Sequence, residues 1–179
     1  NLTGRKYYQK MYIYEDFYDE PVSYNVRCTS ASYHKIGERI MGIILELECD
    51  SQYAWTEPRT NIISFEADKE DWIVNNSDSL DEYVLPQIQI YSKEPIDELR
   101  IINVSDNYRE TIIKNISAGE YIYMDSARCT LSSSIDDRNV LNDFNFVFIK
   151  LLSGANMYKT NKDVEISFKF KEPRKVGLR

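Results

Sequence analysis

Few residues of this chain have the types and the spacing that catalysis requires. His34 is the single histidine among 179 residues, so a Ser-His-Asp triad or a histidine-rich metal site lacks its main component. We favour a loop or surface position without a ligand for His34. Cys49 lies beside Asp50, and the sequence supplies no neighbouring base that would activate its thiol. These residues therefore argue against nucleophilic catalysis.

Acidic residues are abundant, but their spacing selects no site. Asp136, Asp137 and Asp143 could bind Ca²⁺ together, yet they lack the bidentate glutamate that closes an EF-hand loop, and we favour a solvated acidic turn. A glycosidase needs two opposed carboxylates, and nothing in the sequence singles out such a pair. We therefore expect no catalytic residues, no metal site, no cofactor and no enzymatic activity.

The tyrosines favour binding over catalysis. The chain has 14 tyrosines against 7 phenylalanines, and half of the tyrosines lie within the first 33 residues. Tyrosine is enriched at protein interfaces, although a buried core also fits this pattern. The candidate interface residues are Tyr7, Tyr8, Tyr12, Tyr14 and Tyr18.

The two tryptophans, Trp55 and Trp72, are residues on which a sugar ring could stack. We favour a core or domain-junction position for both, because a large aromatic side chain near a linker commonly packs there. Trp72 remains the candidate glycan platform, and burial of its side chain would remove that role.

Charge and composition exclude several classes of protein. The net charge is −7, from 22 basic and 29 acidic residues, which disfavours nucleic-acid binding. No apolar run reaches the roughly 18 residues of a membrane span. We expect Cys28, Cys49 and Cys129 to be free, mostly buried thiols in a reducing compartment, with one disulfide plus one free thiol as the alternative.

Alternation of apolar and polar residues is the main structural signal. It runs without a break through residues 164–171 and also appears in residues 86–91. Residues 144–151 are apolar on both faces and predict a central strand. Further strands are expected at residues 7–14, 22–28, 40–49, 61–66, 72–75, 99–104, 111–114, 121–125 and 128–131. Strands that recur about every 8–12 residues are typical of antiparallel sandwiches and barrels.

Two connections carry local signals. Residues 117–120 predict a tight hairpin in which Gly119 takes a positive φ angle. Residues 32–38 are the single helical candidate, one turn with Ser32 as N-cap and Gly37 near its end. The chain is therefore expected to be all-β.

A change of composition near residues 54–60 suggests a domain boundary. This segment is polar and contains Pro58, as linkers often do. We therefore divide the chain into residues 1–55 and a sandwich domain of residues 56–179. The few strands of the first part are marginal alone, so they must pack on the sandwich, on a partner or on preceding sequence.

A series of short motifs resembles the distal tail proteins of long-tailed (siphovirus-type) phages and prophages of Gram-positive bacteria. Residues 47–55 are similar to the family's Glu-Cys-Asp-Ser-Pro-Tyr-Ala-Trp junction. The other motifs follow in the family's order, at residues 73–78, 83–90, 99–103, 116–125, 144–146, 151–156 and 170–177. Ser77 stands where the family usually has glycine.

The resemblance implies a two-part structural protein. The family's N-terminal belt domain forms a hexameric ring, and its C-terminal domain is a galectin-like β-sandwich (a jelly roll) outside the ring. Residues 1–55 would be the C-terminal remnant of the belt, with Asp50, Tyr53 and Trp55 at the domain junction. The chain starts at Asn1 without an initiator methionine, which fits a fragment or a processed chain. We expect this chain to be a monomer or a weak oligomer.

The resemblance also implies a function. The full-length protein would be a homo-hexameric hub that connects the tail tube to the tail-tip protein and the receptor-binding proteins. It would lie at the tail tip of the virion, and in the host cytoplasm during assembly, without nucleic-acid or membrane contacts. The alternative is a β-sandwich module that binds host cell-wall glycan through Trp72, and a glycan hydrolase is the least favoured reading.

Overall fold

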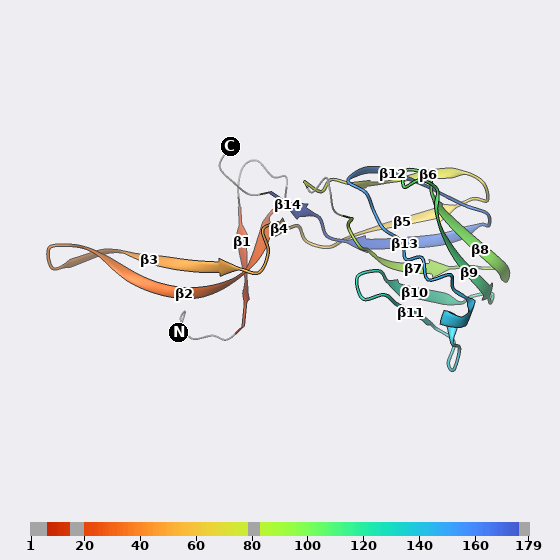
Figure 1. Cartoon of the computed structure of the whole chain (residues 1–179), viewed down its shortest axis with the longest axis horizontal. Coiled ribbons are helices and arrows are strands. Elements are labelled where there is room, and N and C mark those ends of the chain that lie inside the picture. Colours follow the sequence, from red (N-terminus) through yellow and green to blue (C-terminus); the bar gives the residue numbers. More distant parts are fainter. Residues whose placement is uncertain (1–6, 15–19, 79–82, 176–179) are drawn as a thin grey trace. The chain divides into compact units, whose positions relative to one another are not determined.

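A computed structural model describes residues 7–14, 20–78 and 83–175; Tyr18 lies outside these ranges (Figure 1). The described residues form antiparallel β-strands and one short 3₁₀ helix, η1 (Val140–Asp143). None of the helical segments among them is long and apolar enough to cross a bilayer. The prediction of an all-β chain is confirmed. Contacts divide the strands into two units, one with β1–β4 and β14 and the other with β5–β13.

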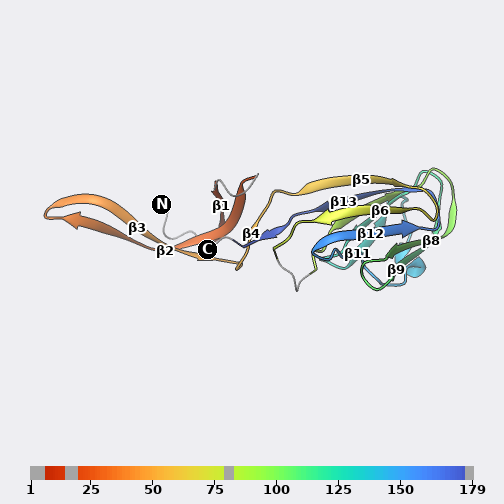
Figure 2. The same cartoon turned by 90° about the horizontal axis from the view of Figure 1, so that it is seen from above.

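The second unit is a two-layer antiparallel β-sandwich. One layer has five strands in the order β11-β10-β7-β13-β5, and the other has four in the order β6-β12-β8-β9 (Figures 1 and 2). The strands are β5 (Arg59–Phe65), β6 (Glu70–Asn75), β7 (Gln87–Tyr91), β8 (Ile96–Asn103), β9 (Arg109–Ile116), β10 (Tyr121–Asp125), β11 (Thr130–Ser133), β12 (Gly154–Thr160) and β13 (Val164–Phe170). The uninterrupted alternation at residues 164–171 therefore belongs to an interior strand of the larger sheet.

The core lies between the two layers because each sheet turns one apolar face inward. In β13, Ile166 and Phe168 are fully buried, whereas Glu165, Ser167 and Lys169 face outward. Tyr158 of β12 meets Phe168 from the other sheet, with ring centroids 5.5 Å apart. Each large apolar side chain buried here contributes about 1.5–3 kcal/mol, so this core provides the main stabilisation of the unit.

Three buried asparagines connect strand ends to neighbouring loops. Asn75, Asn103 and Asn156 are at most 2% exposed. The Asn75 side chain accepts from the Ser77 N–H at 3.1 Å and donates to the Leu152 carbonyl at 3.0 Å. Asn156 accepts from the Leu152 N–H at 2.8 Å and donates to its carbonyl at 2.9 Å. The amides thus satisfy loop backbone that would otherwise be buried without partners.

Residues 144–151 do not form the central strand that their composition predicted. Their backbone makes two isolated bridges, and Phe146 has a φ angle of 60°, which interrupts an extended strand. The Asn145 side chain accepts a hydrogen bond from the Ile112 N–H of β9 at 3.1 Å in place of a regular ladder. The prediction was wrong because Phe144 and Leu151 enter the core from a loop at its rim instead of lining one face of a strand.

The turn at residues 117–120 has the predicted backbone but not the predicted topology. Gly119 has a φ angle of 76°, as expected. The turn links β9 of the four-stranded sheet to β10 of the five-stranded sheet, so it crosses between layers and is not a hairpin. Local sequence indicated the change of direction but not the sheet that receives the next strand.

The first unit is a smaller sheet built on a long hairpin. Its strands are β1 (Gln9–Ile13), β2 (Val22–Ile36), β3 (Arg39–Cys49), β4 (Ala54–Trp55) and β14 (Pro173–Arg174), in the order β1-β2-β4-β14 with β3 on β2. The helical turn predicted at residues 32–38 is wrong, because β2 continues to Ile36 and a tight turn follows at Gly37, whose φ angle is 61°. Pairing with β3 overrides the weak N-cap signal. Strand β14, which the sequence division had assigned to the sandwich, pairs with β4 in this unit.

Candidate functional site

The first unit carries an uncovered two-stranded extension, the hairpin arm, which we define as residues 27–48 of β2 and β3 (Figures 1 and 2). β1 pairs with β2 only as far as Val26, and the rest of β2 pairs with β3. A two-stranded ribbon has no second layer to cover it. Side chains on both faces of the hairpin arm are therefore available for contacts with another molecule.

The pairing register sorts the side chains of the hairpin arm onto two different faces. Residues directly opposite one another share a face, and successive pairs alternate between faces. Two register shifts, at Thr29 and at Met41, each leave one residue out of this pairing. The apolar face carries Cys28, Ala31, Tyr33, Lys35, Ile40, Ile43, Leu45 and Leu47. The polar face carries Arg27, Ser30, Ser32, His34, Ile36, Arg39, Gly42, Ile44, Glu46 and Glu48.

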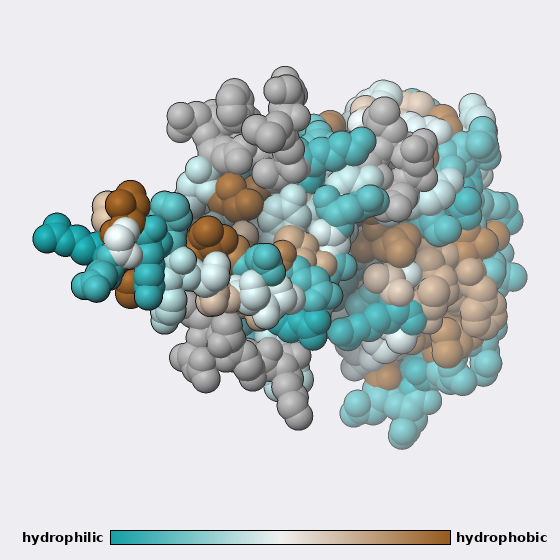
Figure 3. Space-filling view, turned by 60° about the vertical axis from the view of Figure 1, so that its left-hand side comes forward, coloured by the Kyte–Doolittle hydropathy of each residue, from teal (hydrophilic) through white to brown (hydrophobic). Residues whose placement is uncertain are grey.

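The apolar face is open to solvent over most of its length. Ile43 is 63% exposed and Leu45 is 41% exposed, and Tyr33, Ile40 and Leu47 are exposed as well. Figure 3 shows hydrophobic groups interspersed with hydrophilic ones over the hairpin arm, on the left. A row of large aliphatic side chains that stays exposed among the described residues is typical of a protein–protein contact surface.

The polar face is held by hydrogen bonds between the strands. Arg27 lies 2.5 Å from Glu48, the Ser30 hydroxyl donates to Glu46 at 2.6 Å, and the Tyr8 hydroxyl donates to Glu48 at 3.1 Å. The hydrogen bonds from Arg27 and Tyr8 hold the pKa of the Glu48 carboxyl below its usual value. These groups are exposed, so they orient the hairpin arm more than they stabilise it.

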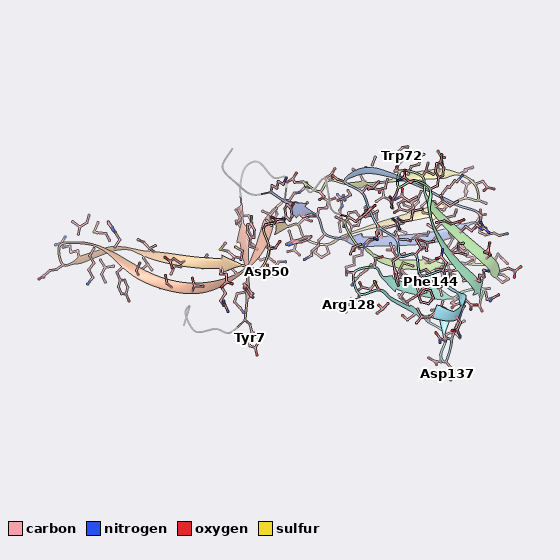
Figure 4. All side chains as sticks on the ribbon, in the orientation of Figure 1. Tyr7, Asp50, Trp72, Arg128, Asp137 and Phe144 are labelled. Carbon is pink, nitrogen blue, oxygen red and sulfur yellow. The ribbon has the colours of Figure 1, made fainter. Side chains whose placement is uncertain are left out.

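Four of the predicted interface tyrosines are among the described residues, and they lie on and beside β1. Tyr7 (Figure 4) and Tyr14 are 78% and 79% exposed, and Tyr8 and Tyr12 are exposed to a smaller extent. The Tyr8 and Tyr12 hydroxyls each donate to a glutamate at 3.1 Å. A core position is therefore wrong for these four side chains, and their role in an interface stays a prediction.

The predicted junction residues all lie in the first unit. Asp50 accepts a hydrogen bond from the Asn25 side chain at 2.8 Å, at the end of β3. Tyr53 is half-buried, and the Trp55 carbonyl in β4 accepts from the Ser23 hydroxyl at 3.3 Å. These contacts tie β4 into the sheet of this unit, and a role in a domain junction stays a prediction.

Trp72 is not a core residue. Its side chain is 56% exposed on β6, an edge strand of the four-stranded sheet (Figure 4), so the core position favoured for it is wrong. It lines an open hollow of about 500 Å³ between β5 and β6, together with Ile62, Val74 and Arg59. The Arg59 guanidinium is already bound to Glu172 and to the Val74 carbonyl. Trp72 thus keeps the exposure that a glycan platform needs, and Thr60 and Asn61 are the uncharged polar residues that line the same hollow.

The cysteines are free, as expected, but they are not mostly buried. Cys28 is half-buried, while Cys49 and Cys129 are exposed. Cys49 ends the uncovered strand β3, and Cys129 lies in a turn with a φ angle of 53°. The burial expected from the average behaviour of cysteine was wrong because Cys49 ends a strand of the exposed ribbon and Cys129 lies in a surface turn.

The remaining chemical candidates are dispersed. His34 is exposed on the polar face of the hairpin arm. Asp143 accepts from the Asn115 side chain at 2.8 Å and lies 3.6 Å from Arg138, whereas Asp137 lies in the exposed loop after β11 (Figure 4). Across residues 7–14, 20–78 and 83–175, no three potential metal ligands come together.

Sequence reasoning missed two surfaces. One is the apolar face of the hairpin arm, whose residues predicted a strand but gave no sign of its exposure. The other is a hollow of about 360 Å³ on the outer face of the five-stranded sheet, lined mainly by polar residues of β7, β10, β11 and β13. The signal for the second surface was present, because these polar residues alternate with buried ones along each strand.

Comparison with known proteins matches this chain to two phage tail domains and to a solved structure with a similar fold. A family profile described as a phage tail protein N-terminal domain matches residues 1–51, and one described as a phage tail C-terminal domain matches residues 53–170. No curated protein matches the chain significantly. The structure of the Dit protein (gp 19.1) of phage SPP1, described as a paradigm of the hub adsorption apparatus in phages that infect Gram-positive bacteria, is similar with a TM-score of 0.65 and 12% identity. The match covers 94% of this chain but only 66% of the SPP1 protein, and it shows a shared fold.

Proposed function

The chain belongs to a family of phage tail proteins with an N-terminal and a C-terminal domain, and we propose that it is a structural hub component at the tip of the tail. The observation that carries this proposal is the uncovered apolar face of the hairpin arm. A component whose task is assembly must present a surface that another chain covers. The fold shared with SPP1 Dit, itself a hub protein, supports the same role.

The partner of the hairpin arm is a second copy of this chain. The five exposed Ile, Leu and Tyr side chains of this face are already about half covered, so burying the rest yields roughly 4–8 kcal/mol, whereas association costs about 4–15 kcal/mol. One such contact therefore barely offsets the cost of association, so this chain should self-associate weakly and only at high concentration. In a closed ring every copy makes two contacts, and the full-length protein gains stability as a homo-hexamer.

The hub role defines the other partners. The family places the protein in the phage tail. At the tip, a ring of subunits would join the tail tube on one side to the tail-tip protein and the receptor-binding proteins on the other. Assembly would take place in the host cytoplasm. The role is mechanical and requires no catalysis, because its work is done by surfaces that stay bound.

Sedimentation velocity over a wide concentration range tests the contact. Leu45 and Ile44 are adjacent and exposed, but they lie on opposite faces of the hairpin arm. Leu45→Lys should weaken self-association at least about tenfold, because it places a charge in the apolar contact, whereas Ile44→Lys should leave it unchanged. A wild-type chain that stays strictly monomeric at the highest concentration, or equal effects of the two variants, would contradict the contact.

Glycan binding by the sandwich is the second candidate function, because Trp72 is exposed on a β-sandwich, where sugar rings often stack on aromatic side chains. It does not compete with the hub role, since the two use different units of the chain. Loss of saccharide binding in Trp72→Ala would support the position that the sequence suggested.

A further inference from the structure

The outer face of the five-stranded sheet has the features of a binding site. Its hollow of about 360 Å³ lies within the roughly 300–1,000 Å³ of small-molecule sites. Strand pairing aligns the side chains of this face in two rows across the sheet. The first row is Thr60, Lys169, Gln87, Asp125 and Thr130, and the second row is Ile62, Ser167, Gln89, Tyr123 and Ser132. All of these residues except Ile62 line the hollow.

A ladder of tyrosine rings ends at the hollow. The ring centroids of Tyr91 and Tyr121 are 4.7 Å apart, and those of Tyr121 and Tyr123 are 6.3 Å apart, both in stacked arrangements. Tyr123 is the last ring of the ladder, lines the hollow and is 44% exposed. Contact with Tyr121 restricts the Tyr123 ring, so its face is arranged for a further flat partner before any ligand arrives.

Amides and hydroxyls surround this ring. Gln89 lies opposite Tyr123 on β7, and Ser132 lies opposite it on β11. The Gln87 side chain donates to Asp125 at 3.2 Å, which orients the Gln87 amide. Amide and hydroxyl groups both donate and accept hydrogen bonds. A sugar ring presents hydroxyls at its edge and C–H groups on its face. The amides and hydroxyls of this surface can bond to the sugar hydroxyls, and the aromatic ring can contact the C–H face.

The charge of the face selects among ligands. Lys169 and Asp125 are the two charged residues that line the hollow, and Asp125 also lies 3.9 Å from Arg128 and accepts from the Ala127 N–H at 3.1 Å. A polyanion would meet no cationic cluster here and would be repelled by the net charge of −7. A protein partner would need an apolar centre, which these polar rows do not provide. An uncharged polar ligand fits the balance of charges.

We propose that this face binds a neutral saccharide chain, with Tyr123 as the stacking platform and Gln89 as a hydrogen-bonding residue. This proposal takes up the second candidate function and moves the site from Trp72 to Tyr123. The hollow beside Trp72 shares Thr60 with the hollow at Tyr123, but its other lining residues are mostly aliphatic. It does not depend on the hub role, because the hairpin arm contributes no residue to it.

Two-dimensional NMR of the whole ¹⁵N-labelled chain tests the proposal, with neutral oligosaccharides of galactose, glucose, rhamnose and N-acetylhexosamine as probes. At least one probe should shift the backbone amides of β7, β10 and β13. Tyr123→Ala and Gln89→Ala should each weaken that binding about tenfold or more. Tyr123→Phe keeps the ring and should stay within about threefold. The control is Tyr108→Ala, which removes an exposed tyrosine that does not line the hollow and should bind like the wild type.

Three results would overturn the proposal. The first is the absence of shifts with every neutral probe up to saturation of their solubility. The second is loss of binding in Trp72→Ala with full binding in Tyr123→Ala, which would place the site at β6. The third is stronger binding of a polyanionic wall teichoic acid than of any neutral probe. Amide spectra of the variants report their folding, and sedimentation of the same samples reports self-association separately.

Discussion

The hydroxyl group of Tyr158 occupies the centre of the buried polar network in the sandwich. It donates to the Lys150 carbonyl at 2.7 Å and accepts from the Asn103 amide at 3.0 Å, and the same amide lies 3.2 Å from the Asn156 carbonyl oxygen. The side chain is 1% exposed, and its burial raises the pKa of the phenol well above its ordinary value of 10.0. The folded protein therefore holds this proton more tightly than the unfolded chain does.

A dependence of stability on alkaline pH follows from this burial. Below pH 10 the phenol is protonated in the folded and in the unfolded state, so the full stability is present. As the pH rises further, the unfolded chain loses this proton before the folded protein does. The free energy of unfolding then falls by up to about 1.4 kcal/mol per pH unit. Urea unfolding between pH 8 and 11 should show this slope in the wild type. Tyr158→Phe should be less stable by about 1–3 kcal/mol at neutral pH, because it leaves buried groups unpaired, and should lack that part of the slope. The same slope in both proteins would contradict the assignment.

At the level of elements, the sequence predicted those strands that have one apolar and one polar face. It did not predict the structure of segments whose two faces have the same polarity. Strand β13 was found almost to the residue, because its buried and outward positions differ in polarity. Residues 144–151 are apolar for another reason, namely that they close the rim of the core, and periodicity cannot separate the two cases. The second half of β2 was missed because its serines and alanine suit several structures, and its pairing with β3 is a long-range contact.

The side chain of Asn145 holds the irregular segment of residues 144–151 on β9. Its hydrogen bonds stand in for those of a regular strand ladder. The side chain accepts from the N–H groups of Ile112 and Val147, at 3.1 and 3.2 Å, and donates to the Glu110 carbonyl at 3.0 Å. Asn145→Ala should therefore destabilise the sandwich by about 2 kcal/mol and speed hydrogen exchange at the Ile112 and Val147 amides.

The matched control for this prediction is Asn139→Ala. The Asn139 side chain accepts a single hydrogen bond, from the Leu141 N–H at 3.2 Å, at the start of η1. Its loss should cost about 0.5–1.5 kcal/mol and leave exchange on β9 unchanged. Equal effects of the two variants would mean that the Asn145 side chain does not hold the segment on β9.

At the scale of the molecule, the family and the all-β sandwich were within reach of the sequence, whereas the exposure of particular side chains was not. Trp72 and Leu45 illustrate the reason. Both have residue types that are usually buried, and both lie in strands that were predicted, but their exposure follows from an edge position and from a missing second layer. The phage tail family, which the comparisons confirm, was predicted from the order of many short motifs. No single residue among them identifies the family.

The two units differ greatly in the apolar surface that they bury. The hydrophobic core lies entirely within the unit formed by β5–β13. Among the described residues of the first unit, the buried aliphatic and aromatic side chains are Val22, Val26, Ala54 and Pro173. The sandwich thus contains the interactions that a small domain needs for independent stability, and the first unit does not.

We therefore expect residues 58–172, expressed alone, to fold as a monomer. Its thermal midpoint, followed by circular dichroism, should lie within about 5 °C of the main transition of the whole chain, because the core is unchanged. Its sedimentation should not depend on concentration, since the hairpin arm is absent, and it should match the whole chain carrying Leu45→Lys in that respect. A fragment that binds hydrophobic dyes and lacks a cooperative transition would show that the first unit is needed for folding and is more than a surface for assembly.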